Sequence, residues 1–135
     1  IGMEMYNQLY LKNNLLDVDE IIIENQPVLK NPTMKSVQMI LYSYFLLMKK
    51  LSQNSNTYNI NLFNARKKLA IYDGPKVDVS NIKNAYNRRK YQSVEYTKYF
   101  IEKYNQNWKE SFTTNKKKDD LADCYLQGLT YYYNK

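Results

Sequence analysis

The chain has 135 residues, enough for one hydrophobic core but not for two, so the sequence predicts a single domain. Its formal net charge of +7 favours a polyanionic partner, usually nucleic acid, although charge alone also fits a merely soluble basic protein. One cysteine excludes an internal disulfide and suits a reducing compartment, and the lack of histidine excludes an imidazole base or metal ligand.

No apolar run reaches the roughly 18 to 20 residues that span a bilayer, and no signal peptide is visible, so no membrane partner is expected. The sequence begins with Ile1-Gly2 rather than with Met. We therefore expect a fragment, a processed form or part of a longer polypeptide.

The elements follow the order helix, strand, helix, strand, helix, helix, which is an α/β pattern. In the first half, apolar periodicity and helix breakers predict a helix over 3–15, a strand over 18–24 and a helix from Pro32 to Leu51 capped by Asn31. A polar linker over 52–57 and a strand over 58–63 follow. The second half is predicted to form a helix from a cap at Ser80 or Asn81 to Asn105, a loop over 105–118 and a helix over 119–133. The three isoleucines at 21–23 predict a strand that is buried on both faces.

Carboxylates stand at two places where metal chemistry could occur. Glu24 ends the apolar run of the first strand, and Asp120 and Asp123 are spaced to project from adjacent turns of one helix face. Three such oxygen ligands in a basic chain would suit Mg²⁺ or Mn²⁺ and phosphodiester chemistry. Taken singly, each feature has a plainer explanation: helix capping for the aspartates, and a lysine ion pair for Glu24.

Four short motifs stand in a fixed order along the chain. They are Glu24-Asn25-Gln26-Pro27, Met34-Lys35-Ser36-Val37-Gln38, Asn87-Arg88-Arg89-Lys90 continuing to Ser93-Val94, and Lys118-Asp119-Asp120-Leu121-Ala122-Asp123. Together they resemble the RuvC-type Holliday junction resolvases over residues 3–133. The resemblance is closest to the enzymes of poxviruses and other large DNA viruses, with the fungal mitochondrial resolvases next.

The resemblance implies an RNase H-like fold and a homodimer that nicks four-way DNA junctions symmetrically with Mg²⁺. Glu24 would match the family's glutamate on a strand, Asp120 and Asp123 its paired aspartates on a helix, and Asp119 would be a further candidate ligand. The helix over 33–51, with Tyr42, Tyr44 and Phe45, would contribute to the dimer interface.

The sequence departs from the family's pattern at the fourth carboxylate, an aspartate on the first strand. Asp17 and Asp19 precede Glu24 too closely to replace it. We therefore expect an N-terminally incomplete RNase H-like domain over 1–135 that lacks the first three strands and is inactive by itself.

Three basic clusters are candidate phosphate contacts that would position a DNA arm. They are Arg66-Lys67-Lys68, Arg88-Arg89-Lys90 and Lys116-Lys117-Lys118. The plainer alternative for any one of them is a solvated face. The tyrosines and the tryptophan are expected to pack in the core or the dimer rather than to stack on bases.

The function expected from these features is that of a Holliday junction resolvase, a metal-dependent endodeoxyribonuclease that would process viral DNA concatemers. It would act inside the cell, at a viral replication site or in a mitochondrion. Two alternatives stay open: a non-catalytic DNA-binding or assembly module with the same fold, and another RNase H-like nuclease.

Overall fold

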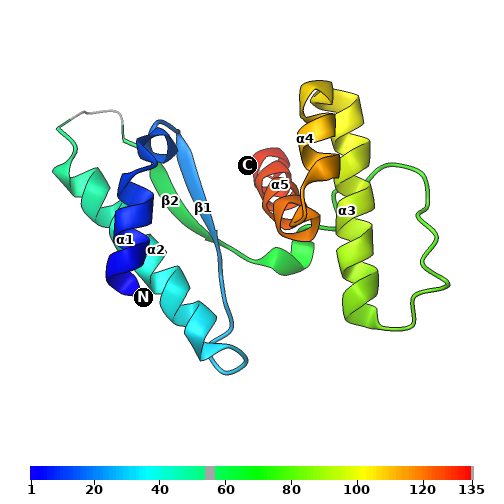
Figure 1. Ribbon diagram of the computed structural model, residues 1–135, viewed down its shortest axis with the longest axis horizontal. Helices are drawn as coiled ribbons and strands as arrows, with labels where there is room; N and C mark the ends of the chain where they lie inside the picture. The colour runs from blue at the N-terminus through cyan, green and yellow to red at the C-terminus, as the bar shows by residue number, and fades with distance from the viewer. Residues whose placement is uncertain (54–56, 135) are drawn as a thin grey trace. The chain divides into compact units, whose positions relative to one another are not determined.

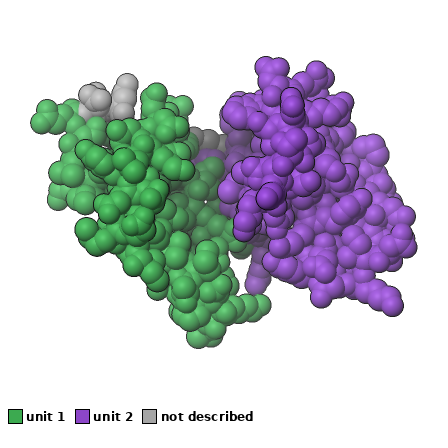
Figure 2. Space-filling model, viewed as in Figure 1, with its two compact units in different colours: residues 1–64 green, residues 65–135 purple. Residues whose placement is uncertain are grey.

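The computed structural model describes residues 1–53 and 57–134, so positions 54–56 of the expected linker lie outside the described residues. The chain divides into two compact units, Ile1–Asn64 and Ala65–Lys135 (Figure 2). Each unit is described below by itself. No helix in the described part of the chain is both long and apolar enough to cross a membrane.

The first unit is a small α/β layer. It contains α1 (Gly2–Tyr10), a 3-10 turn η1 (Asn13–Leu16), β1 (Glu20–Glu24), α2 (Pro32–Leu51) and β2 (Asn59–Phe63). The two strands pair in parallel, and Figure 1 shows both helices of this unit beside the β1–β2 sheet. The helix expected over 3–15 ends early, at Tyr10, where the polar run Lys12-Asn13-Asn14 favours turns.

Helix α2 begins and ends where the sequence predicts. The Asn31 side chain accepts a hydrogen bond from Met34 N, and Pro32 occupies the first turn, where its missing N–H costs nothing. Tyr44 and Phe45 pack in the core of this unit against β1 rather than on its surface. The large apolar side chains that α2 exposes are instead Met34, Met39, Leu46, Leu47 and Leu51.

Strand β1 is buried on one face only, so the expectation of burial on both faces is wrong for the described residues. Ile21 and Ile23 lie in the core, whereas Glu20, Ile22 and Glu24 are half-buried on the opposite face. In the register, Ile22 lies beside Asn61 of β2, and Glu20 accepts a hydrogen bond of 2.9 Å from that amide. The outer face of the pair is thus partly polar.

The second unit is helical. It contains the 3-10 turns η2 (Ala65–Lys67) and η3 (Gln106–Trp108), and the helices α3 (Ala85–Tyr104), α4 (Lys109–Thr114) and α5 (Lys118–Tyr133). Helix α3 begins later than expected because Asn84 is the cap: its Oδ1 accepts hydrogen bonds from Tyr86 N and Asn87 N. The expected loop over 105–118 is largely helical, and Phe112 of α4 is buried there.

Helices α3 and α5 pack along each other, and α4 covers one end of that pair (Figure 1). Ile101, Phe112 and Ala122 form the centre of the core, with Val94 and Tyr125 packed against it. Leu121 and Cys124 are exposed on α5. Tyr72 stacks on Tyr96 with ring centroids 3.7 Å apart, which holds the segment before α3 against that helix.

Candidate active site

Glu24 is the last residue of β1. It lies beside Phe63 in the strand register, and the next residue continues the pairing because Asn25 N donates 2.8 Å to Phe63 O. The half-buried Glu24 is therefore carried by backbone that is hydrogen-bonded on both sides of it. This is the rigid strand-end position that the sequence predicts for the residue.

Two side chains of α2 hold the segment that follows Glu24. Gln38 is 2 % exposed, and its Oε1 accepts a hydrogen bond of 2.7 Å from Gln26 N. Lys35 Nζ donates to the same oxygen at 3.2 Å and to Asn25 Oδ1 at 3.0 Å. The chain's exit from β1 is therefore fixed by polar contacts as well as by the sheet.

Lys35 and Gln38 belong to one of the four motifs of the sequence, but the sequence predicts no role for them. The signal for Gln38 was available, because it lies three residues before Leu41 and seven before Phe45, on the apolar face of α2. A glutamine on such a face needs hydrogen-bond partners. The Gln38 Oε1 finds one in the backbone after β1, whereas its buried Nε2 has none among the described residues.

The second acidic position is the start of α5. Asp119 and Asp120 lie in its first turn, where carboxylates complement the helix dipole, but no side chain caps the helix at Lys117. Asp123 follows one turn later on the same helix. The plainer explanation, complementing the helix dipole, therefore fits Asp119 and Asp120, whereas Asp123 lies beyond the first turn.

Each of the three aspartates lies near a lysine. Lys90 Nζ lies 2.7 Å from Asp119 Oδ2, and Lys68 Nζ lies 2.7 Å from Asp123 Oδ2. Lys117 Nζ is 3.9 Å from Asp120 Oδ2, and both of these side chains are largely exposed. The second unit thus brings three carboxylates and three ammonium groups together at the start of one helix.

The Lys90–Asp119 pair shifts both groups toward their charged forms. The hydrogen bond from Lys90 lowers the pKa of Asp119, and the hydrogen bond to Asp119, followed by contact with the Tyr86 hydroxyl, raises the pKa of Lys90. The Lys90 ammonium also lies 4.9 Å from the centre of the Tyr86 ring. Asp119 is therefore an ionised carboxylate throughout the neutral range.

The described residues of either unit contain no group of three or more carboxylate or thiol side chains close enough to share a metal ion. The aspartates nevertheless suit a hard divalent cation. Mg²⁺ commonly takes one or two protein carboxylates and completes its octahedron with waters and substrate phosphates. Asp120, with only a long contact to Lys117, is the aspartate whose oxygens are most accessible to such an ion.

The basic clusters divide into two groups. Lys68, Lys90 and Lys117 are the ion-pair partners of the aspartates. The other six are Arg66, Lys67, Arg88, Arg89 and Lys116, which are exposed, and Lys118, which is half-buried. Arg88 donates to Lys83 O and Lys118 donates to Thr113 O. The nine predicted phosphate contacts therefore include two, Lys68 and Lys90, that form close ion pairs with an aspartate, and a third, Lys117, whose contact is long and exposed.

By its fold the chain is a mixed α/β protein with a small parallel sheet, and its acidic positions lie at a strand end and at a helix start. A family model described as "Mitochondrial resolvase Ydc2 / RNA splicing MRS1" matches residues 18–134, almost the whole chain. The chain belongs to this family. The match includes Glu24 and all three aspartates of α5.

One curated relative is the "Uncharacterized protein L451" of Acanthamoeba polyphaga mimivirus. It is 32% identical over 126 residues, which cover 87% of this chain. The aligned part is 29% of the relative, so the chain spans less than a third of that protein's length. No solved structure matches the chain at a significant level. Relatives in a giant virus and in mitochondria agree with the resemblance found in the sequence.

Proposed function

We propose that this chain belongs to the nuclease domain of a structure-selective endodeoxyribonuclease that resolves four-way DNA junctions by paired, metal-dependent nicks. The observation that carries the proposal is the family match, which runs through both acidic positions. The lysine-paired aspartates of α5 support it, since basic and acidic groups interleaved at one place suit phosphate and metal together.

The proposed metal ligands are Glu24, Asp120 and Asp123, with Asp119 as a further candidate, and the proposed ion is Mg²⁺, with Mn²⁺ as a substitute. When bound, such an ion would activate a water and stabilise the leaving 3′ oxygen. The contacts of Gln38 and Lys35 fix the backbone that carries Glu24. The hydrogen bond from Lys90 lowers the pKa of Asp119.

The proposed DNA contacts are the exposed members of the three basic clusters, Lys67, Arg88, Arg89 and Lys116 foremost. These side chains would meet phosphates and fix the orientation of a junction arm without reading its sequence. Because each phosphate contact releases counterions, junction binding should weaken steeply as salt rises.

The proposed assembly is a homodimer with an RNase H-like fold. Helix α2 supports this, since Met39, Leu46 and Leu47 on it are about half exposed. Apolar surface of this kind is typical of contacts between subunits. The proposed place of action is where viral or mitochondrial DNA is processed, in keeping with the relatives.

A second candidate function is nucleic-acid binding without cleavage. The family description names RNA splicing beside the resolvase, which favours a member that binds structured RNA or DNA and does not cut it. Such a protein would keep the basic clusters and have no need of the carboxylates.

The test incubates the full-length protein with a four-way DNA junction, a linear duplex of the same sequence, an RNA·DNA hybrid and a structured RNA, with Mg²⁺ or with EDTA. A resolvase nicks the junction at paired, symmetric positions only with Mg²⁺ and leaves the linear duplex intact. Preferred cleavage of the hybrid would indicate another RNase H-like nuclease. Binding of junction or RNA without cleavage in Mg²⁺ or Mn²⁺ would support the second candidate.

A further inference from the structure

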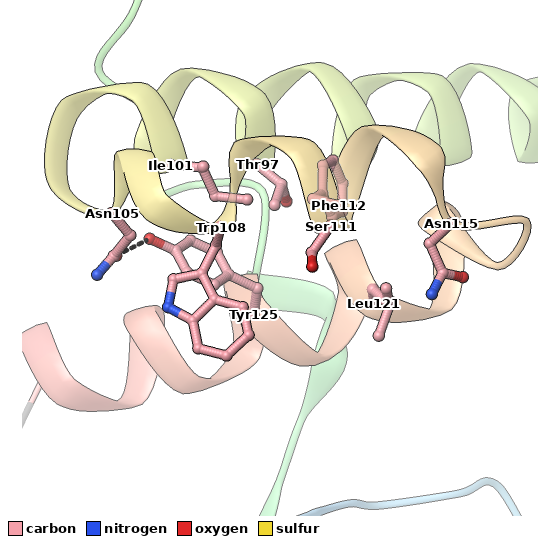
Figure 3. Close-up of a pocket in the computed structure, with 9 residues that line it drawn as sticks. All are labelled: Thr97, Ile101, Asn105, Trp108, Ser111, Phe112, Asn115, Leu121 and Tyr125. Carbon is pink, nitrogen blue, oxygen red and sulfur yellow. Dashed lines mark hydrogen bonds between the residues drawn. The ribbon is translucent and has the colours of Figure 1, made fainter.

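A cavity of about 470 Å³ lies in the second unit, lined by side chains of α3, α4 and α5 and of the turn between α3 and α4 (Figure 3). Its volume is typical of sites that hold a small ligand, roughly 300 to 1,000 Å³. Most of its surface is apolar, and four short polar side chains also line it: Thr97, Asn105, Ser111 and Asn115. This composition suits a flat, mainly apolar ring that carries a few polar atoms.

Trp108 supplies the largest flat surface of the cavity. It is the chain's one tryptophan, and it is 65% exposed although the sequence predicts that it packs in a core or a dimer. Figure 3 shows Asn105 and Trp108 at one end of the cavity and Leu121 and Asn115 at the other. An accessible indole beside an apolar cavity is the arrangement on which nucleic-acid bases stack.

The two amides at the ends of the cavity can donate to a ligand. Asn105 Oδ1 accepts from the Tyr125 hydroxyl at 3.0 Å, and Asn115 Oδ1 accepts from Lys117 N at 2.8 Å. Each amide oxygen thus accepts one hydrogen bond within the protein, and each amide also carries an NH₂ group with two donors. These groups can donate to the carbonyl oxygens on the edge of a base.

Two basic residues follow the cavity-lining Asn115 and could pair with an anionic ligand. Lys116 and Lys117 follow Asn115 directly in the chain, and the Lys117 side chain is 80% exposed. At the same end, Leu121 lines the cavity next to Asp120, a proposed metal ligand. A base held in the cavity would therefore carry its own phosphate toward Lys116, Lys117 and the start of α5.

We propose that this cavity binds one unstacked base of a DNA strand, with the base against Trp108 and its phosphate at Lys116 and Lys117. This base-binding proposal rests on the proposed nuclease function, because that function makes DNA the ligand. It deepens that function by naming where a base at the branch point is held next to the aspartates. Binding in the cavity needs neither Glu24 nor a metal ion, so it can be measured apart from cleavage.

The test uses the full-length protein in EDTA and two probes, the oligonucleotide d(T)₄ and an abasic strand of the same length. Thymine is chosen because it presents two carbonyl acceptors, and the abasic strand has the same phosphates without bases. We expect d(T)₄ to quench the Trp108 fluorescence, identified as the signal that Trp108→Phe removes. The abasic strand should cause no quenching.

Affinities for both probes are then compared with those of Trp108→Ala, whose folding is checked by circular dichroism. We expect this variant to bind d(T)₄ about tenfold more weakly, the size of one base–aromatic stack, and to bind the abasic strand unchanged. Because the indole is exposed, the variant should fold; Trp108→Phe, which keeps a stacking ring, should lose less affinity.

Equal affinity of the wild type for both probes, or no loss in a folded Trp108→Ala, would overturn the proposal. If the Trp108 fluorescence changed with protein concentration in the absence of DNA, the base-binding proposal would be overturned, and Trp108 would be assigned to a contact between copies of the chain. The proposed function fails or holds independently of this result. Preference for d(T)₄ without junction cleavage would reject the nuclease function and support base binding in the cavity. Junction cleavage without preference for d(T)₄ would support the nuclease function and reject base binding in the cavity.

Discussion

Lys68 Nζ lies 2.7 Å from Asp123 Oδ2 and ties the basic run after η2 to helix α5. The Lys68 side chain is 16% exposed and its backbone oxygen lies 3.5 Å from the Thr130 Oγ1, so the contact is part of the packing of this unit. Asp123 therefore has a structural contact in addition to its proposed role as a metal ligand. A loss of activity on changing Asp123 would not by itself distinguish the two.

A double variant separates the two roles of Asp123. Asp123→Asn should lower the free energy of unfolding by about 1 kcal/mol because it leaves the Lys68 ammonium without its partner. Lys68→Met with Asp123→Asn should recover that stability and still fail to cleave, as measured by urea unfolding and by junction cleavage. Recovery of cleavage in the double variant would assign Asp123 to structure alone.

Gln38 is expected to be essential for the stability of the first unit. Gln38→Met removes the acceptor of Gln26 N and should cost about 1 to 3 kcal/mol of unfolding free energy, the penalty of a buried unpaired N–H. Ser36→Ala is the matched control on the same helix, since the Ser36 hydroxyl bonds only exposed backbone at Pro32 O. Equal stability of the two variants by urea unfolding would contradict the role assigned to Gln38.

The Lys90–Asp119 contact predicts a pH effect of defined sign. Because the pKa of Asp119 is lowered in the folded state, its contribution to stability is present above the ordinary aspartate pKa, about 3.9, and is lost as pH falls through the folded value. Carboxyl NMR should show Asp119 titrating below that value, and Lys90→Met should move the pKa of Asp119 up. Lys117→Met, the control, should leave it in place. A titration of Asp119 unaffected by Lys90→Met would show that another group lowers its pKa.

Two glycines should respond to alanine in opposite directions. A Cβ at Gly74 would lie 2.6 Å from the Tyr72 ring, which is stacked on Tyr96, so Gly74→Ala should destabilise the second unit. At Gly128, inside α5, a Cβ meets no atom within 4 Å, and Gly128→Ala should stabilise the protein by about 0.5 to 1 kcal/mol. Thermal unfolding measures both, and a stable Gly74→Ala would show that Tyr72 can leave its stack freely.

The sequence predicts the long elements well because their periodicity and their caps agree. Helix α2 matches from Pro32 to Leu51, where the Asn31 cap, Pro32 and a regular apolar face all indicate the same start. Local rules failed where tertiary packing decides. The stretch expected as a loop over 105–118 became helical because Phe112 is buried against α3 and α5, and polar composition hid that contact.

In the candidate site, too, local spacing could be predicted from the sequence whereas tertiary contacts could not. The spacing of Asp120 and Asp123 could be converted into positions on a helix, because residues three apart lie on adjacent turns. The partners of Asp123 and Asp119 could not be predicted, since Lys68 and Lys90 come from distant parts of the chain. Lys117, by contrast, lies only three residues from Asp120. The exposure of Trp108 could not be predicted either, because sequence spacing does not reveal that its indole is left in solvent.

The carboxylates are proposed to hold a metal ion for cleavage. The most direct test compares two variants of the full-length protein: Asp120→Asn and the control Glu110→Gln, which changes an exposed acid on α4. Cleavage of a four-way junction in Mg²⁺ and binding of that junction in Ca²⁺ are measured for both. Asp120→Asn should bind the junction and cleave it about a hundredfold more slowly or worse, since a lost ligand removes several kcal/mol of transition-state stabilisation. Glu110→Gln should match the wild type. Cleavage by Asp120→Asn at the wild-type rate would contradict the account.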